Sequence, residues 1–216
     1  MTRLFVATAV AVLGLTTTAT GQSPDKPTRE LFRNNEPILS RIGAADRFVT
    51  IQTRDSFEGL EGPHVYPSAE LELLDLAANA EILVIHGVQE EPHFVDNGTW
   101  VKTTVTAIVD QVLKSTRLAA YPGLKVTFEL EGGELMVKGT RILAGLTPIF
   151  SRQSNLVALY FDEDLSGWRL VRLFEISADR KLKPHHSKGS NVAAESKLHG
   201  KTLDEIALVV AKRNHK

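Results

Sequence analysis

Apolar residues recur with a period of two along several stretches of the chain. Val126, Phe128 and Leu130 alternate with polar neighbours, which predicts a half-buried strand because successive side chains of a strand point to opposite faces. Ile82 to Val88 is a continuous, largely β-branched run that is typical of a strand buried on both faces, and Gly87 within it indicates a bulge or a sharp bend. Further strands are expected over residues 48–53, 99–113, 135–143, 155–161 and 168–176.

Turn-forming residues separate these stretches. Asn97-Gly98 lies between two apolar pairs, and residues that tolerate positive φ suit the two central positions of a type I′ turn, so a hairpin is expected there. Pro122-Gly123 and Gly132-Gly133 mark two further turns. Short strands with recurring turns predict one β-barrel or sandwich domain.

Two stretches follow a helical period instead. Ser68 is a suitable N-cap for a short helix that ends at Asn79. Thr202 and Glu205 form a capping box for a last helix, whose apolar stripe must be buried against a neighbouring surface. This stripe consists of Leu203, Ile206, Ala207 and Val210. The predicted fold is therefore mainly β: a small OB-like barrel, closed or partly open, preceded by a short helix and followed by an amphipathic C-terminal helix.

The first residues have the pattern of a cleavable signal peptide. Arg3 precedes the apolar run Leu4 to Leu15, which is shorter than the about 20 residues that a membrane-spanning helix needs. Ala19 and Gly21 suit the small-residue positions before a signal peptidase cut, which places cleavage near Gly21. The mature protein is expected in the periplasm or the medium, without a transmembrane anchor.

The pattern divides the chain into four parts. Residues 1–21 are the signal peptide, and residues 22–67, which are rich in proline, charge and turn formers, are expected to be a flexible lead-in. Residues 68–178 hold the OB-like barrel. Residues 179–216 are a basic linker followed by the C-terminal helix.

Composition narrows the possible chemistry. The chain contains no cysteine, which excludes disulfides, a lipid-bearing cysteine, cysteine-ligated zinc and a thiol nucleophile. Charge is unevenly distributed: residues 22–179 carry 15 Lys/Arg and 23 Asp/Glu, whereas residues 180–216 carry 9 and 3. A basic tail can bind phosphate, anionic lipid or an acidic partner, and it can also dock on the acidic body of its own chain.

Strand cores and turn glycines in the middle of the chain carry a family resemblance. The pieces are Ala80 to Val88, Val105 to Lys114, Glu131-Gly132-Gly133, Pro148-Ile149-Phe150 and Leu156 to Phe161. In order and spacing they resemble a pattern in exported bacterial proteins of unassigned function that have an OB-like barrel, similar in topology to the tissue-inhibitor-of-metalloprotease and netrin-like modules.

This resemblance implies an OB-like barrel fold and nothing more. It covers just under half of the chain, and it carries no activity over. The metal-chelating N-terminal cysteine of those inhibitors has no counterpart in a cysteine-free chain. Ser154-Asn155 stands where the pattern has Gly-Glu before its last core strand.

One group of residues is a candidate metal site. His86, His93 and Asp96 provide two imidazoles and a carboxylate close to the predicted hairpin, a donor set that can bind zinc. The alternative is that they are solvated loop residues, because residues three apart on a strand point to opposite faces. Less specific groups are the tail histidines His185, His186, His199 and His215, the carboxylates Glu129, Glu131 and Glu134, and Asp162, Glu163 and Asp164.

Two functions from different classes remain open on this basis. The first is a non-enzymatic binding or envelope-associated module that uses no cofactor and has a protein or small-ligand partner outside the cytoplasm. The second is a metal-dependent hydrolase built on His86, His93 and Asp96. Nucleic acid is not the expected partner, since the body is acidic and strand aromatics are sparse.

Overall fold

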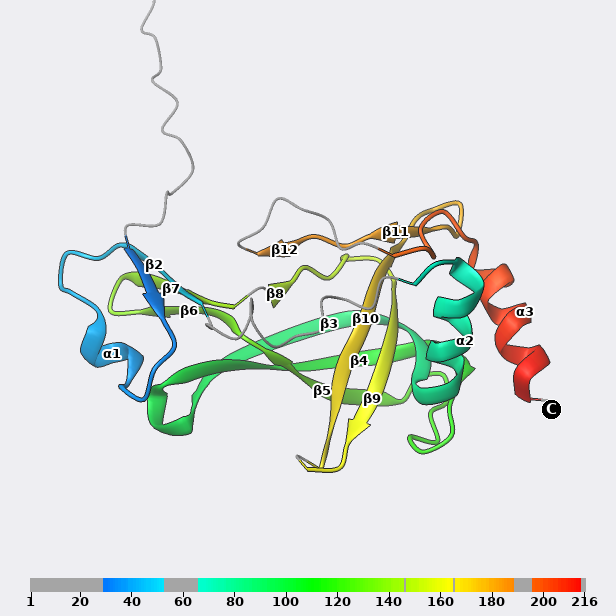
Figure 1. Cartoon of the computed structure of the whole chain (residues 1–216), viewed down its shortest axis with the longest axis horizontal. Coiled ribbons are helices and arrows are strands. Elements are labelled where there is room, and N and C mark those ends of the chain that lie inside the picture. Colours follow the sequence, from blue (N-terminus) through cyan, green and yellow to red (C-terminus); the bar gives the residue numbers. More distant parts are fainter. Residues whose placement is uncertain (1–28, 53–65, 146, 165, 189–195, 215–216) are drawn as a thin grey trace, which may run out of the picture.

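Five strands close into a barrel at the centre of the molecule (Figure 1). The computed structural model describes residues 29–52, 66–145, 147–164, 166–188 and 196–214, so the predicted signal peptide lies outside the described residues. The barrel strands are β3 (Glu81–Val95), β4 (Trp100–Lys114), β5 (Lys125–Glu131), β9 (Asn155–Asp162) and β10 (Gly167–Ile176).

The strand order around the barrel is β3, β4, β5, β10, β9 and back to β3. All neighbours are antiparallel except β5 and β10, which are parallel and share a single residue pair, Arg169 with Glu129. Of the two predicted alternatives, closed or partly open, the barrel is therefore closed, although β5 and β10 are joined by one residue pair alone.

The barrel interior is filled by the apolar side chains that alternate along the strands. Val126, Phe128 and Leu130 of β5 are buried while Lys125 and Thr127 are exposed, so the predicted alternation is confirmed. Their partners inside the barrel are Leu83, Ile85, Val105, Ala107, Val109, Val157, Leu159 and Leu173.

Strand β3 shows why its apolar run is continuous. Residues 81–85 are buried on both faces, because one face lines the barrel and the other is covered by helices. Gly87 has φ +60° at a register shift between His86 and Gln89, which confirms the predicted bulge.

The predicted hairpin joins β3 to β4, but with a longer loop than a two-residue turn. Val95 pairs with Trp100, so four residues make the connection, three of them in a short 3₁₀ turn, η2 (Asp96–Gly98). Asp96 and Asn97, which tolerate left-handed backbone, have φ 51° and 58° and precede Gly98 at φ 84°. The positive φ was therefore predicted, and the loop length was not.

A second, four-stranded sheet corrects two predictions. Its strands are β1 (Arg29–Phe32), β2 (Phe48–Gln52), β7 (Thr140–Ala144) and β6 (Gly133–Val137), with a short helix α1 (Ile38–Arg41) between β1 and β2. Residues 29–52 of the predicted flexible lead-in are thus ordered, because β2 pairs in parallel with β7, far away in sequence. Residues 135–143 form no single strand, since Lys138 and Gly139, both at positive φ, turn the chain into a hairpin.

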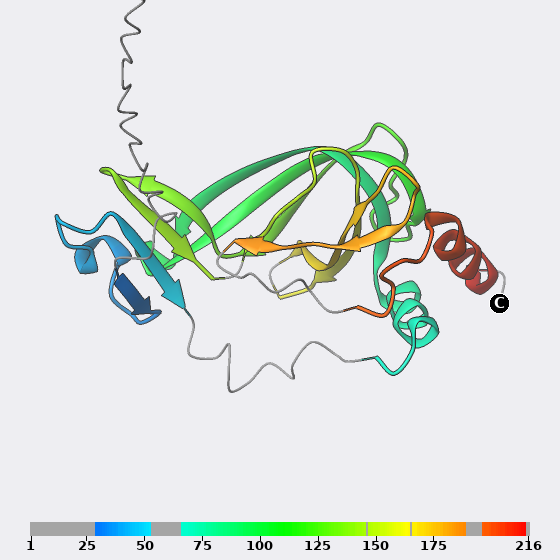
Figure 2. The ribbon, with the colours of Figure 1, turned by 90° about the horizontal axis from the view of Figure 1, so that it is seen from above.

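Two helices cover the barrel at the end opposite to this sheet (Figures 1 and 2). The first is α2 (Ala69–Asn79), where the Ser68 hydroxyl accepts a hydrogen bond from the Leu71 amide. The second is α3 (Leu203–Asn214), where the Thr202 and Glu205 side chains each accept a hydrogen bond from the other residue's amide. Both caps were predicted.

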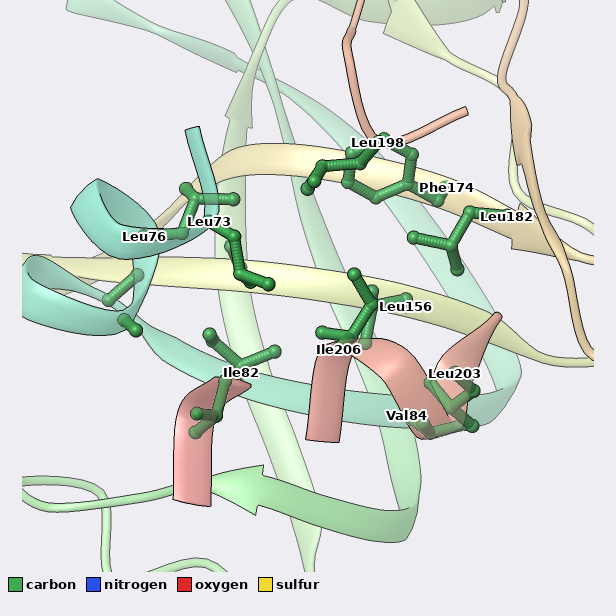
Figure 3. Packing of buried hydrophobic residues seen from close by; sticks show 14 of the residues in the cluster. Leu73, Leu76, Ile82, Val84, Leu156, Phe174, Leu182, Leu198, Leu203 and Ile206 are labelled. Atoms are coloured by element: carbon green, nitrogen blue, oxygen red, sulfur yellow. The ribbon is translucent and has the colours of Figure 1, made fainter. Parts of the chain in front are cut away.

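Both helices pack on the outer face of β3, β9 and β10 (Figure 3). Leu73 and Leu76 of α2, Leu203 and Ile206 of α3, and Ile82 and Val84 of β3 belong to one buried cluster. The predicted docking of the last helix is confirmed, because three residues of its stripe, Leu203, Ile206 and Val210, are buried.

Part of the predicted basic linker is also ordered. The chain returns along the barrel as β11 (Leu182–Pro184), which pairs with the end of β10. It continues as β12 (Ser187–Lys188), which pairs with β8 (Thr147–Pro148). The polar sequence of the linker did not predict these strands, because they are held by pairing with β10 and β8.

Candidate functional site

The barrel wall has a gap where β5 meets β10, which we call the seam. Strand β9 pairs with one edge of β10 along most of its length, so β5 and β11 share the other edge. On that edge β5 pairs only at Arg169, and β11 pairs only from Phe174 to Ile176. Within the part of the chain that the structure describes, residues 170–173 have no strand partner there.

A groove of about 310 Å³ lies along this unpaired stretch. Leu130, Leu170 and Leu173 line it and also pack into the barrel interior, which makes its floor apolar. Charged side chains and a histidine surround this floor. The other lining residues are Glu129, Glu131, Pro148, Arg169, Val171, Arg172 and His185.

Lys102 of β4 holds the two carboxylates on the β5 side of the groove. Its Nζ lies 3.1 Å from Oε2 of Glu129 and 3.6 Å from Oε1 of Glu131. Burial alone would lower the pKa of Lys102, but the hydrogen bond to Glu129 and the charge of Glu131 outweigh it and raise the pKa. Glu131 also accepts a hydrogen bond from the indole of Trp100, so both carboxylates have fixed positions.

Two arginines face them from β10. Arg169 Nε lies 2.8 Å from Oδ2 of Asp162, and Arg172 Nε lies 3.3 Å from Oε1 of Glu72 in α2. Glu72 is only 1 % exposed, and it also accepts hydrogen bonds from the Ser196 hydroxyl and the Lys197 amide. The charged residues that line the groove itself are two glutamates and two arginines. Counted with their ion-pair partners, the network has four carboxylates and three cations.

His185 closes one end of the groove. Its Nδ1 lies 2.9 Å from the carbonyl oxygen of Leu173. Because a carbonyl oxygen can only accept a hydrogen bond, Nδ1 carries the proton and donates it. Burial lowers the pKa of His185, although the hydrogen bond to Leu173 acts in the opposite direction. At neutral pH the imidazole therefore adds no charge to the rim.

The residues proposed from sequence as a metal site are not brought together. His86 and His93 lie seven positions apart on β3, about 23 Å at the rise of an extended strand. Asp96 is engaged by Arg33 at 2.8 Å. In the ordered ranges no group of three or more His, Asp or Glu side chains is placed to hold a metal ion.

His86 has different neighbours from those expected. Its Nδ1 lies 2.6 Å from Oδ1 of Asp110, and the Ser154 hydroxyl donates to the other oxygen of the same carboxylate at 3.3 Å. Asp110 thus lies between serine and histidine, whereas nucleophilic activation of a serine needs the histidine in the middle.

The less specific groups are also dispersed. Glu129 and Glu131 reach the groove, while Glu134 pairs with Arg141. Asp162 and Glu163 pair with separate arginines, Arg169 and Arg117. Among the tail histidines, His185 reaches the groove, His199 packs edge-on against Phe174, and His215 lies outside the described residues.

The sequence did not single out Lys102, Arg169 or Arg172. Each occupies an ordinary polar position of a strand, and only closure of the barrel brings them to one groove. A local signal exists in β10, where Val171 interrupts the alternation, and the structure has a register shift at this residue.

The chain matches no family model, no curated protein and no solved structure. Among the described residues, no helix is both long and apolar enough to cross a membrane.

Proposed function

We propose that the mature protein is a non-enzymatic binding module outside the cytoplasm, and that it captures a short extended peptide segment with basic side chains in the seam groove. The observation that carries this proposal is the stretch of β10 at residues 170–173, which lies in a groove and has no strand partner on that edge.

An unpaired strand edge is a template for another strand. Its N–H and C=O groups can pair with an extended peptide, while pockets for alternate side chains give specificity. In residues 170–173 the carbonyl oxygens of Val171 and Leu173 accept hydrogen bonds from the side chains of Arg172 and His185, which a peptide would have to displace or avoid. Four residues of open edge span about 13 Å, which suits a segment of four to six residues. The apolar floor of Leu130, Leu170 and Leu173 offers a place for one apolar side chain of that segment.

Charge favours a basic peptide. The ion-pair network around the groove has one carboxylate more than it has cations, and residues 22–179 carry 15 Lys/Arg against 23 Asp/Glu. Glu129 and Glu131 are about half exposed, so an incoming cation can reach them. Exposed charges are screened by salt, and binding should weaken as ionic strength rises.

Export rests on the N-terminal pattern alone. The apolar run Leu4 to Leu15 with small residues at Ala19 and Gly21 supports cleavage of a signal peptide. N-terminal sequencing of protein from the periplasm or medium of an expressing bacterium should give Gln22 as the first residue. Retention of Met1 would contradict export.

The binding test uses a dye-labelled hexapeptide of alternating lysine and valine, capped at both ends. Fluorescence anisotropy should show saturable binding that falls with salt, and much weaker binding of the matching glutamate and valine peptide. Val171 lines the groove at 40 % exposure, so Val171→Trp should fill it and reduce affinity by about tenfold or more.

Two controls make this result specific. Val171→Thr keeps the volume and should bind as the parent does, and Glu91→Gln removes an exposed carboxylate of β3 outside the groove. Circular dichroism verifies that each variant is folded. Equal affinity of Val171→Trp and the parent, or no binding of the lysine peptide, would refute the peptide-binding role.

A further inference from the structure

A second hollow, of about 220 Å³, lies at the end of the barrel beside α2 and shares no lining residue with the seam groove. Three aromatic residues line it: Tyr160 and Phe161 at the end of β9, and Trp168 at the start of β10. Phe161 and Trp168 meet edge to face, with their ring centroids 5.1 Å apart at 75°. Tyr160 is 48 % exposed, which is unusual for a large aromatic of this barrel. We call this hollow the aromatic pocket.

Planar polar groups complete the pocket. Arg117 lies over the ring of Phe161 and forms an ion pair with Glu163, and Asn79 projects from the last turn of α2. The Arg117 and Glu163 side chains are 51 % and 70 % exposed, so both are accessible to a ligand. An amide, a guanidinium and a carboxylate together offer several donors and acceptors around the aromatic rings.

Buried charged residues hold the base of the pocket. Lys114 is 8 % exposed and donates to the carbonyl oxygens of Ala78 and Ala80 at 3.2 and 2.9 Å, which fixes the end of α2. Glu81 is 4 % exposed and accepts hydrogen bonds from the amides of Thr116 and Arg117 at 2.8 and 2.9 Å. The loop that carries Arg117 is thus anchored before any ligand arrives, which lowers the entropic cost of binding.

We propose that the aromatic pocket binds a neutral saccharide through one sugar ring. A sugar ring has an apolar C–H face that packs on aromatic rings and a rim of hydroxyls that suits planar polar side chains, and OB-like barrels bind oligosaccharides. The pocket is smaller than the about 300 to 1,000 Å³ typical of drug-sized ligands, so it fits a single ring.

An anionic ligand fits the pocket less well. The two buried charges at its base face protein groups, and the exposed Arg117 is neutralised by Glu163. No net positive charge is left for a phosphate or a nucleic-acid backbone.

The chain's own tryptophans report binding. Trp168 lines the aromatic pocket, whereas Trp100, the other tryptophan, is 2 % exposed and lies elsewhere. Titration with chitotetraose, cellotetraose and maltotetraose at millimolar concentrations should give a saturable change in tryptophan emission with at least one of the three. Absence of a saturable change with all three would overturn the proposal.

Matched variants assign the signal to the pocket. Tyr160→Ala should weaken binding of the active saccharide by about tenfold, and Asn79→Ala should also weaken it. Tyr121→Ala removes a tyrosine that is 61 % exposed and does not line the pocket, so its affinity should equal that of the parent. Unchanged affinity in both Tyr160→Ala and Asn79→Ala would also overturn the proposal. Val171→Trp separates the two sites, because it should reduce peptide affinity by about tenfold or more and leave saccharide affinity unchanged.

Discussion

The two sides of the barrel are built differently. On one side, β3 and β4 are paired from Ile82 to Val95, and both faces of residues 81–85 are buried. On the other side, β5 and β10 share one pair, and charged side chains surround the opening. The comparison shows that the same barrel has one wall held by continuous strand pairing and another where part of the β10 edge has no strand partner among the described residues.

Hydrogen exchange should show the largest difference between the two sides. Amides of β3 and β4 in the paired wall should exchange only through global unfolding, whereas amides of residues 170–173 that point away from β9 should exchange orders of magnitude faster. Saturation with the lysine and valine peptide should slow exchange in that stretch alone. Similar protection of both sides before peptide is added would contradict an open seam.

Truncation of core leucines should show the next largest effect. Leu83 is fully buried in the closed wall, so Leu83→Ala should lower the free energy of unfolding by about 3 kcal/mol. Leu170 is only partly buried at the seam, and Leu170→Ala should cost about 1 kcal/mol. Urea denaturation measures both, and equal losses would show that the seam is as well packed as the wall.

Removing the charge that anchors Arg172 should have an intermediate effect. Glu72→Gln should lower the free energy of unfolding by about 2 kcal/mol, because Arg172 then has no buried carboxylate to pair with. Glu70→Gln removes an exposed carboxylate from the same helix, and its effect should stay within about 0.5 kcal/mol. Equal effects in urea denaturation would show that the seam does not depend on this anchor.

The pH dependence of stability should show the smallest effect. Burial lowers the pKa of His185, so the unfolded chain binds a proton before the folded chain does as the pH falls below about 6.5. Stability contributed by this group is present above that pH and is lost below it, and His185→Asn should make the decline shallower. His199 also has a pKa lowered by burial, so part of the decline should remain. The exposed His186→Asn is the control, measured as the urea midpoint between pH 7 and pH 5.

Local patterns predicted those features that depend on neighbours in sequence. The alternation of Val126, Phe128 and Leu130, the Ser68 cap and the Thr202 capping box reflect backbone geometry within a few residues, and all three are confirmed. The strand predicted at residues 48–53 is confirmed as β2. The order of residues 29–47 was missed, because β1 is held by β2, which itself pairs with β7 about ninety residues later in sequence.

The candidate site was less accessible to prediction. The groove exists because β5 and β10 meet at a single pair, and nothing within either strand specifies how far they stay together. The metal site predicted at His86, His93 and Asp96 rested on residue type alone. The extended geometry of β3 keeps the two histidines apart. The rim residues Arg169 and Arg172 have the residue types of any solvated strand face.

The hydrogen bond between Glu72 and the Lys197 amide joins positions 125 residues apart. It has a consequence for the timing of folding. A chain that emerges from its N-terminus carries Glu72 long before residues 196 and 197 are available, so this carboxylate stays in water until synthesis is nearly complete. Burial of α2 against the barrel is therefore a late event, and a chain that ends before residue 196 should remain open at this end of the molecule.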